Sequence, residues 1–258
     1  MAEPVRIQKA LADAGVASRR AADALVAAGR VTVNGLPAVT GQRVDPGVDA
    51  LAVDGRAIVP AGRRTYLVMH KPAGVTSTVS DRHAERTVLD LLPPELRTSG
   101  ARLYPVGRLD RDSEGLILLT DDGDWTQQLL HPRYRVEREY AVALRVPLDQ
   151  AQASALSDGI EMDEGLATLG GLRLATRTET ARLARDDSHA ATPTWYRVVL
   201  TQGWRRQLRR MFAAVGAPVE RLVRVRIGSL RLDDMPPGSV RALSSAERSR
   251  LTASRDAS

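Results

Sequence analysis

The sequence predicts an α+β protein with two domains and a short tail. Its 258 residues fit one large or two smaller domains, at roughly 100–200 residues per domain. The turn-prone, charged segment 60–64 is typical of a linker. Beyond it, short strands mix with two or three helices without regular βαβ alternation, which favours an antiparallel or mixed sheet. We therefore expect domains at residues 1–62 and 63–243, followed by a disordered polar tail at 244–258.

Two helices and a hairpin are expected in the N-terminal domain. Apolar residues at helical spacing predict a first helix over residues 5–14. Ser18 is a suitable N-cap for a second helix over residues 19–28. Residues 31–33 are a predicted strand, and Asn34 with the glycine after it suits a tight hairpin turn.

The second domain contains apolar runs of strand length and fewer amphipathic helices. Residues 65–69 and 116–119 are predicted strands, and 186–193 is a predicted exposed loop. Helices are expected at residues 125–130, 144–156 and 207–215. The last helix has Leu208, Met211 and Phe212 on one face and arginines on the others, so we expect Phe212 in the core.

Composition excludes several classes of protein. The chain has no cysteine, which excludes disulfide scaffolds, cysteine-based metal sites and thiol nucleophiles. Its four histidines are scattered, and the phosphate-binding loop, zinc-helix and G-x-S-x-G patterns are missing, so we expect no metal. The polar start is unlike a signal peptide, and no apolar run approaches the ~20 residues that span a bilayer. We therefore expect a cytoplasmic protein without membrane contacts.

Positive charge is concentrated near the C-terminal end. The formal net charge is +6, yet residues 203–231 alone carry eight arginines against one acid, Glu220, so the rest of the chain sums to −1. Clustered arginine is typical of a protein that binds a polyphosphate such as RNA. The alternative is a solvated helix face whose acidic partners lie elsewhere in the fold. A second group of cations lies along the two N-terminal helices: Arg6, Lys9, Arg19, Arg20 and Arg30. For this group, composition leaves binding to an RNA backbone and an ordinary solvated surface equally open.

A charged loop precedes the predicted strand 116–119. It holds Arg108, Asp110, Arg111, Asp112 and Glu114 within seven residues. A loop between rigid elements is a common place to hold a carboxylate at fixed geometry. Ordinary turn chemistry is the alternative, with one of the two aspartates capping a turn and pairing with an arginine.

The N-terminal segment resembles a known RNA-binding module. Residues 6–20, which include Ser-Arg-Arg, and residues 29–35, which include Val-Asn-Gly, are similar to the small domain first seen in ribosomal protein S4. The likeness covers roughly residues 4–60. It implies an RNA partner and leaves the reaction open.

A second resemblance rests on residues 107–116, which read Gly-Arg-Leu-Asp-Arg-Asp-Ser-Glu-Gly-Leu. They resemble the signature of bacterial RNA pseudouridine synthases of the RsuA/RluB branch. Three further segments resemble motifs of that family in the same order: 69–77, 136–142, and 203–212 with 222–230. The resemblance implies a catalytic domain with a mixed, largely antiparallel sheet and flanking helices. It also implies a cofactor-free enzyme that isomerises uridine in ribosomal RNA.

The resemblance also implies roles for single residues. Asp110 matches the family's essential aspartate, Tyr140 the tyrosine that packs against the target base, and Arg209 the basic residue that pairs with the aspartate. The positions implied in RNA binding are Arg108, Lys71, Arg206, Arg210, Arg6, Lys9, Arg19 and Arg20.

These residue types suit the chemistry. Conversion of uridine breaks the N1–C1′ bond, turns the base and rejoins it through C5, and it needs an ionised carboxylate acting as nucleophile or as base. A neighbouring arginine favours that ionised form. The target base must leave the RNA stack at a cost of a few kcal/mol, of which a tyrosine ring returns roughly 1–3 kcal/mol by stacking.

The expected function is therefore site-specific pseudouridine formation in ribosomal RNA. Residues 136–142 are closer to members that act on the large-subunit RNA, which favours 23S over 16S. The alternatives are the same reaction on 16S RNA, or a catalytically silent RNA-binding assembly factor with the same fold. Partners are ribosomal RNA, free or in pre-ribosomal particles, and we expect a monomer without a cofactor.

Overall fold

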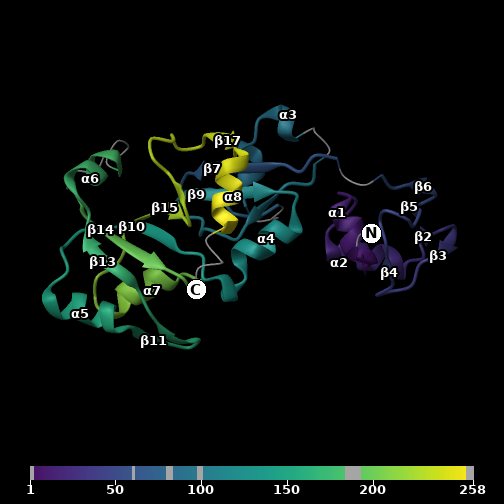
Figure 1. Cartoon of the computed structure of the whole chain (residues 1–258). Coiled ribbons are helices and arrows are strands. Elements are labelled where there is room, and N and C mark those ends of the chain that lie inside the picture. The colour runs from purple at the N-terminus through teal and green to yellow at the C-terminus, as the bar shows by residue number, and fades with distance from the viewer. Residues whose placement is uncertain (1–2, 60–61, 80–83, 98–100, 184–192, 254–258) are drawn as a thin grey trace. The chain divides into compact units, whose positions relative to one another are not determined.

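The computed structural model describes residues 3–59, 62–79, 84–97, 101–183 and 193–253. The chain divides into two compact units. The first unit consists of Met1–Tyr66, Pro93–Tyr104 and Thr120–Gly123. The second unit consists of Leu67–Leu92, Pro105–Leu119 and Asp124–Ser258. Helices and strands occur in both, as Figure 1 shows, in agreement with the expected α+β class. The domain boundary at residue 62 stays a prediction. Residues 186–192 of the expected loop and part of the linker expected at 60–64 lie outside the described residues.

Across its described residues, the first unit has three helices and two small sheets. Strand β1 pairs with β4, and a second sheet has the order β3-β2-β5-β6. The elements are β1 Val5–Arg6, α1 Ile7–Asp13, α2 Arg19–Ala27, β2 Val31–Val33, β3 Leu36–Pro37, β4 Arg43–Val44, β5 Leu51–Val53, β6 Arg56–Ala57 and α3 Pro94–Arg97. The first helix starts two residues later than expected, because residues 5 and 6 pair with β4.

The local signals of this unit act as expected. The Ser18 hydroxyl accepts a hydrogen bond from the Ala21 amide at 3.2 Å, as an N-cap should. Asn34 and Gly35 have φ of 53° and 82°, the left-handed pair that a tight primed turn requires. Ile7, Leu11 and Val26 form the core with neighbours from the sheet.

The second unit is built on a nine-stranded sheet. Seven of its strands follow the order β13-β14-β10-β15-β9-β7-β17, while β16 pairs with β15 and β8 pairs with β9. The β9–β15 pair is parallel, whereas β10, β13 and β14 pair antiparallel, so the sheet is mixed and largely antiparallel as expected. The strands are β7 Tyr66–Lys71, β8 Tyr104–Val106, β9 Glu114–Thr120, β10 Arg138–Leu144, β13 Gly170–Leu174, β14 Thr194–Leu200, β15 Arg221–Ile227, β16 Leu230–Arg231 and β17 Val240–Ala242, beside a separate hairpin of β11 Ile160–Met162 and β12 Gly165–Ala167.

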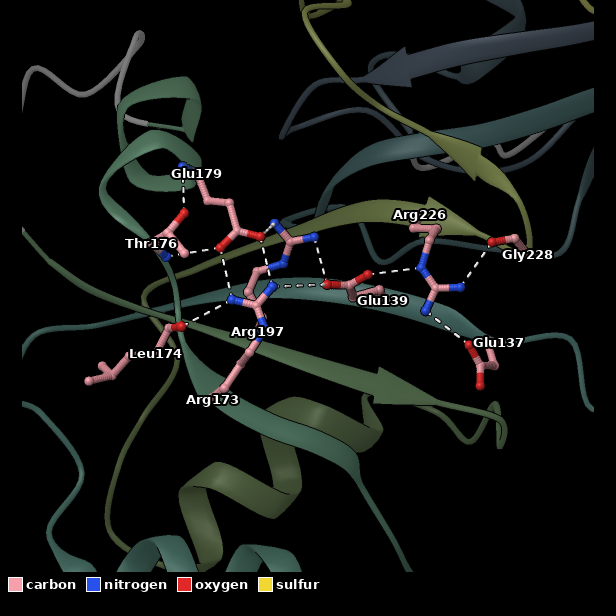
Figure 2. Close-up of polar contacts among 9 residues, drawn as sticks. All are labelled: Glu137, Glu139, Arg173, Leu174, Thr176, Glu179, Arg197, Arg226 and Gly228. Carbon is pink, nitrogen blue, oxygen red and sulfur yellow. Dashed lines mark hydrogen bonds and ion pairs between the residues drawn. The ribbon is translucent and has the colours of Figure 1, made fainter.

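Helices lie on both faces of this sheet. Figures 1 and 2 agree in placing α6 and α7 on opposite faces of β10 and β14. The helices are α4 Gly123–Leu130, α5 Gln150–Asp158, α6 Arg177–Leu183, α7 Gln207–Ala214 and α8 Ser245–Ala253, with short 3₁₀ turns η1 Val88–Leu91 and η2 Pro132–Tyr134. Phe212 is fully buried, as expected. Across the described residues, each helix is too short or too polar to cross a membrane.

Two expectations were wrong. The helix expected at 144–156 is α5, which starts at Gln150, because Leu144 ends β10 and Asp149 caps the helix by accepting from the Gln152 amide at 2.8 Å. Residues 245–253 of the expected disordered tail form α8, in which Leu251 is buried. A single buried leucine in a polar segment is too weak a sequence signal to predict this helix.

Candidate active site

A cavity of about 1680 Å³ lies in the second unit. Four segments that are far apart in the sequence line it: the loop before β9, strand β10, the segment leading into α7, and strand β15. Asp110, Arg108, Tyr140 and Arg206 all line this cavity, so the fold brings together predicted residues from three of the motifs.

The loop that carries Asp110 is held in place by the segment after β7. The Ser77 hydroxyl donates to the Leu109 carbonyl at 2.8 Å and accepts from the Leu109 amide at 3.1 Å. The Gly74 amide donates to the Arg111 carbonyl at 2.8 Å. These bonds fix the backbone on either side of Asp110, so the carboxylate is presented from a braced loop. Sequence reasoning did not select Ser77, although it belongs to the first matched motif.

Lys71 has a structural position and does not line the cavity. Its side chain is fully buried, and its ammonium donates to the carbonyls of Pro72, Arg111 and Ser113 at 2.9, 3.3 and 2.6 Å. Burial lowers the pKa of Lys71 from 10.5 to about 8, against the charge of Glu114. The expected substrate contact is therefore wrong for Lys71, which instead ties the end of β7 to residues 111 and 113, just after Asp110.

Asp110 is half-buried at the cavity wall. Its backbone carbonyl accepts the Ser113 amide at 3.1 Å, which closes a turn at this point. Its carboxylate makes no hydrogen bond or ion pair with any residue that the structure describes. An unpaired carboxylate facing a cavity is free to meet a ligand.

Arg209 does not pair with Asp110 in this structure. Its Nε lies 3.3 Å from Asp112 Oδ2, and its Nη2 donates to the Asp112 carbonyl at 3.0 Å. Arg206 donates to both oxygens of the same carboxylate, at 3.2 and 3.3 Å. Partial burial raises the pKa of Asp112, but the Arg206 hydrogen bonds and the Arg209 charge outweigh burial and leave it lowered. The expectation that Arg209 contacts the essential aspartate is thus not met here.

Tyr140 is buried in β10 and lines the cavity between two arginines that sequence reasoning missed. Arg224 of β15 is its direct cross-strand partner, and Arg138 lies two residues earlier on the same face of β10. Arg224 is 3% exposed and its Nε donates to the Leu116 carbonyl at 2.7 Å. Arg138 Nη2 donates to the Leu129 carbonyl at 3.1 Å. The only sequence signal that pointed to an arginine beside Tyr140 was the alternation of arginine with valine in β15.

The opposite face of the same strands holds a cluster of ion pairs (Figure 2). Glu139 binds Arg226 Nε at 2.8 Å and Arg197 Nη2 at 2.7 Å. Glu179 of α6 joins the cluster through Arg197 and Arg173, at 3.0 and 2.8 Å. Arg224 and Arg226 lie on different faces because the β10–β15 register shifts between Glu139 and Tyr140, leaving Val225 unmatched.

The remaining predicted RNA-binding residues differ in availability. Arg108 is exposed at the cavity, whereas Arg210 is bound by both oxygens of Glu164 at 2.8 and 3.0 Å. In the first unit, Arg6, Arg19 and Arg20 are exposed, and Lys9 pairs with Asp13 at 2.6 Å. Within the described ranges, no group of three or more histidine, aspartate or glutamate side chains is placed to hold a metal ion.

Comparisons with known proteins identify the relatives of this chain. The sequence profile of the RNA pseudouridylate synthase family matches residues 65–214, and that of the S4 domain matches residues 5–49. An uncharacterized RNA pseudouridine synthase of Mycobacterium leprae is 40% identical over 93% of this chain and 89% of its own length. The ribosomal large subunit pseudouridine synthase B of Haemophilus influenzae is 36% identical over 90% of this chain and 62% of its own length.

A solved structure supports the fold alone. The crystal structure of a pseudouridylate synthase superposes with a TM-score of 0.62 at 24% identity, covering 96% of this chain and 99% of the other. The profile match and the identity to the relatives show that this chain belongs to the RNA pseudouridine synthase family, with an S4 domain at its N-terminus.

Proposed function

We propose that this enzyme isomerises one specific uridine of 23S ribosomal RNA, with Asp110 as the reacting carboxylate and without a cofactor. The observation that carries the proposal is the unpaired, half-buried carboxylate of Asp110 in a cavity that also contains Tyr140. Three relatives that are 36–37% identical are named ribosomal large subunit pseudouridine synthase B, which favours the large-subunit RNA.

Each part of the cavity has a role in this proposal. The target nucleotide leaves the RNA stack and enters the cavity, where Tyr140 supports the base by ring contact. Asp110 acts at the sugar–base junction, as nucleophile on C1′ or as base on the ribose. Arg108 and Arg206, both exposed beside the cavity, hold the phosphates on either side. Arg6, Arg19 and Arg20 of the S4 domain bind RNA beyond the target.

Arg209 acts as a positioning residue. It is bound to Asp112, two residues from Asp110, and therefore ties α7 to the loop that carries the reacting group. The enzyme works as a cytoplasmic monomer on ribosomal RNA, free or within a pre-ribosomal particle.

Tritium release from ribosomal RNA labelled at C5 of uridine tests the proposal, because the C5 hydrogen leaves as a proton when C5 bonds to C1′. We expect release from 23S RNA with the wild-type protein and none with Asp110→Asn. Persistent release with Asp110→Asn would contradict the role of Asp110. Release from 16S RNA alone would move the substrate to the small subunit, and no release from either RNA would favour a silent assembly factor.

A further inference from the structure

Two arginines line the cavity beside Tyr140, and neither forms an ion pair with an acidic residue in the part of the chain that the structure describes. Arg224 is 3% exposed, and its Nη2 is buried with no hydrogen-bond partner. Arg138 is half-buried, and its guanidinium makes one hydrogen bond, to the Leu129 carbonyl. Both guanidiniums therefore keep N–H donors that no carboxylate among the described residues satisfies.

The two cations also lie close enough to affect each other. Burial lowers the pKa of Arg138, and the positive charge of Arg224 lowers it further. Two acidic residues next to them in the strands are bound elsewhere: Glu139, which follows Arg138, binds Arg226 on the other face, and Glu114, which is paired with Val223, binds Arg221 at 2.7 and 2.9 Å. Buried charge without a partner is costly, so a site of this kind is completed by an electron-rich ligand.

The strand geometry indicates which ligand fits. Directly paired residues of neighbouring strands have Cβ atoms ~5 Å apart, and residues i and i+2 share a face. Arg224 is paired with Tyr140, and Arg138 is at the i−2 position, so both side chains start beside Tyr140 on the face that lines the cavity. A flat base resting on Tyr140 would present its carbonyl edge to them. The backbone phosphates have a different place, since Arg108 and Arg206 are exposed whereas Arg224 is almost completely buried.

We propose that Arg224 and Arg138 donate hydrogen bonds to the carbonyl oxygens of the extruded uracil and stabilise its negative charge during the reaction. The inference rests on the proposed function. When N1–C1′ breaks, the bonding electron pair stays on the uracil and spreads over N1, O2 and O4. The charge is consumed when C5 bonds to C1′, the C5 proton leaves and N1 takes up a proton. Cationic donors placed at the oxygens act where charge develops, which is the most effective use of buried donors.

Single-turnover tritium release and RNA affinity together test the inference. Arg224→Gln and Arg138→Gln should each slow release from 23S RNA labelled at C5 of uridine by about 100-fold or more, the usual effect of losing one donor to a developing oxyanion. The Kd for the same RNA in filter binding should change by less than about threefold, because neither residue binds phosphate. Arg224→Lys keeps the positive charge but loses the planar, forked donor group of arginine. Its rate of tritium release should therefore lie between those of wild type and Arg224→Gln.

Arg226→Gln is the matched control, because Arg226 lies on the same strand as Arg224 but binds Glu139 and Glu137 on the other face. It should lower the Tm and leave the rate of tritium release unchanged. Unchanged rates in both Arg224→Gln and Arg138→Gln would overturn the inference. A loss of RNA affinity equal to the loss of rate would also overturn it, in favour of phosphate binding.

Folding and function are separated by two further readouts. Thermal unfolding shows whether Arg224→Gln is folded; if it is not, Arg138→Gln decides, since Arg138 is less buried. Addition of free guanidinium to Arg138→Ala should restore part of the rate, and failure of rescue in a folded protein counts against the inference. If the wild-type protein releases no tritium from any ribosomal RNA, the proposed function itself fails; if wild type is active and the variants match it, only this inference fails.

Discussion

Arg209 is bound to Asp112, with Nε 3.3 Å from the carboxylate and Nη2 3.0 Å from the backbone carbonyl, and it makes no hydrogen bond or ion pair with Asp110. The two aspartates of one loop thus have different surroundings. Asp112 is neutralised by Arg206 and Arg209, whereas the Asp110 carboxylate is unpaired at the cavity. This division assigns the anchoring of α7 to Asp112 and leaves Asp110 available for the reaction.

We expect Asp112→Asn to lower the rate of pseudouridine formation by about tenfold, because α7 loses its anchor on the Asp110 loop and a misplacement of ~1 Å can cost 100-fold. The Tm should change little, since half-exposed ion pairs contribute only ~0–1 kcal/mol. Tritium release and thermal unfolding measure the two quantities. Glu164→Gln, which frees Arg210 at a similarly exposed pair, is the control and should keep the rate. An unchanged rate in Asp112→Asn would show that the anchor is dispensable.

Lys71→Met should destabilise the folded protein by about 2–4 kcal/mol, because the buried Ser113 carbonyl and the partly buried carbonyls of Pro72 and Arg111 lose their donor. The rate of tritium release should fall as well, since the same bonds fasten the Asp110 loop. Urea unfolding measures the free energy. The other lysine supplies the control: Lys9 has an i,i+4 pair with Asp13, so Lys9→Met should change stability by less than about 0.5 kcal/mol. Equal stability of Lys71→Met and wild type would refute the role of Lys71.

Gly115→Ala should prevent folding or cost roughly 3 kcal/mol or more. A Cβ at this position would lie 2.2 Å from the Arg224 carbonyl oxygen, and the backbone has φ of +104°, a conformation that residues other than glycine rarely adopt. Soluble yield and urea unfolding report the effect. At Gly62 an added Cβ meets nothing within 4 Å, so Gly62→Ala should be within about 0.5 kcal/mol of wild type. A stable Gly115→Ala protein would mean that β9 and β15 can separate.

Acid should weaken the cluster around Glu179. The Arg173 hydrogen bonds lower the pKa of Glu179 from 4.5 to about 2, against partial burial and together with a backbone hydrogen bond and the charges of Arg197 and Arg173. Because the folded pKa is below the unfolded one, the stabilisation is complete above pH 4.5 and is lost as the pH falls toward 2. Urea unfolding of wild type and Glu179→Gln at several pH values isolates this contribution. The difference between the two proteins should shrink below pH 4.5, and a constant difference would contradict the assignment.

Much of the fold could be predicted from local signals. Ser18 and the left-handed pair Asn34 and Gly35 fix the elements of the first unit, because each is a residue type suited to one backbone geometry. The predicted cavity residues Asp110 and Tyr140 came from a family resemblance. The burial of Lys71 could not be predicted, since it depends on three carbonyls brought together by two distant segments.

The arginines were predictable only in part. Their concentration indicates RNA, but sequence gives no means of deciding which of them face a carboxylate. Strict alternation in β15 would place Arg224 and Arg226 on the same face, and a one-residue shift in register separates them. That shift depends on how β15 pairs with β10, which no local pattern reports.

The unmatched residue Val225 has a consequence for how this enzyme can be altered. Because Val225 is unmatched, Arg226 points away from the cavity, and the two faces of the β10–β15 pair can be altered separately. Substitutions around Glu139 can raise or lower the thermal stability without altering the cavity. Substitutions beside Tyr140 can change the reaction rate without disturbing the cluster of ion pairs on the other face. Without the register shift, strict alternation in β15 would place Arg224 and Arg226 on the same face. Thermal stability and turnover could then no longer be engineered independently.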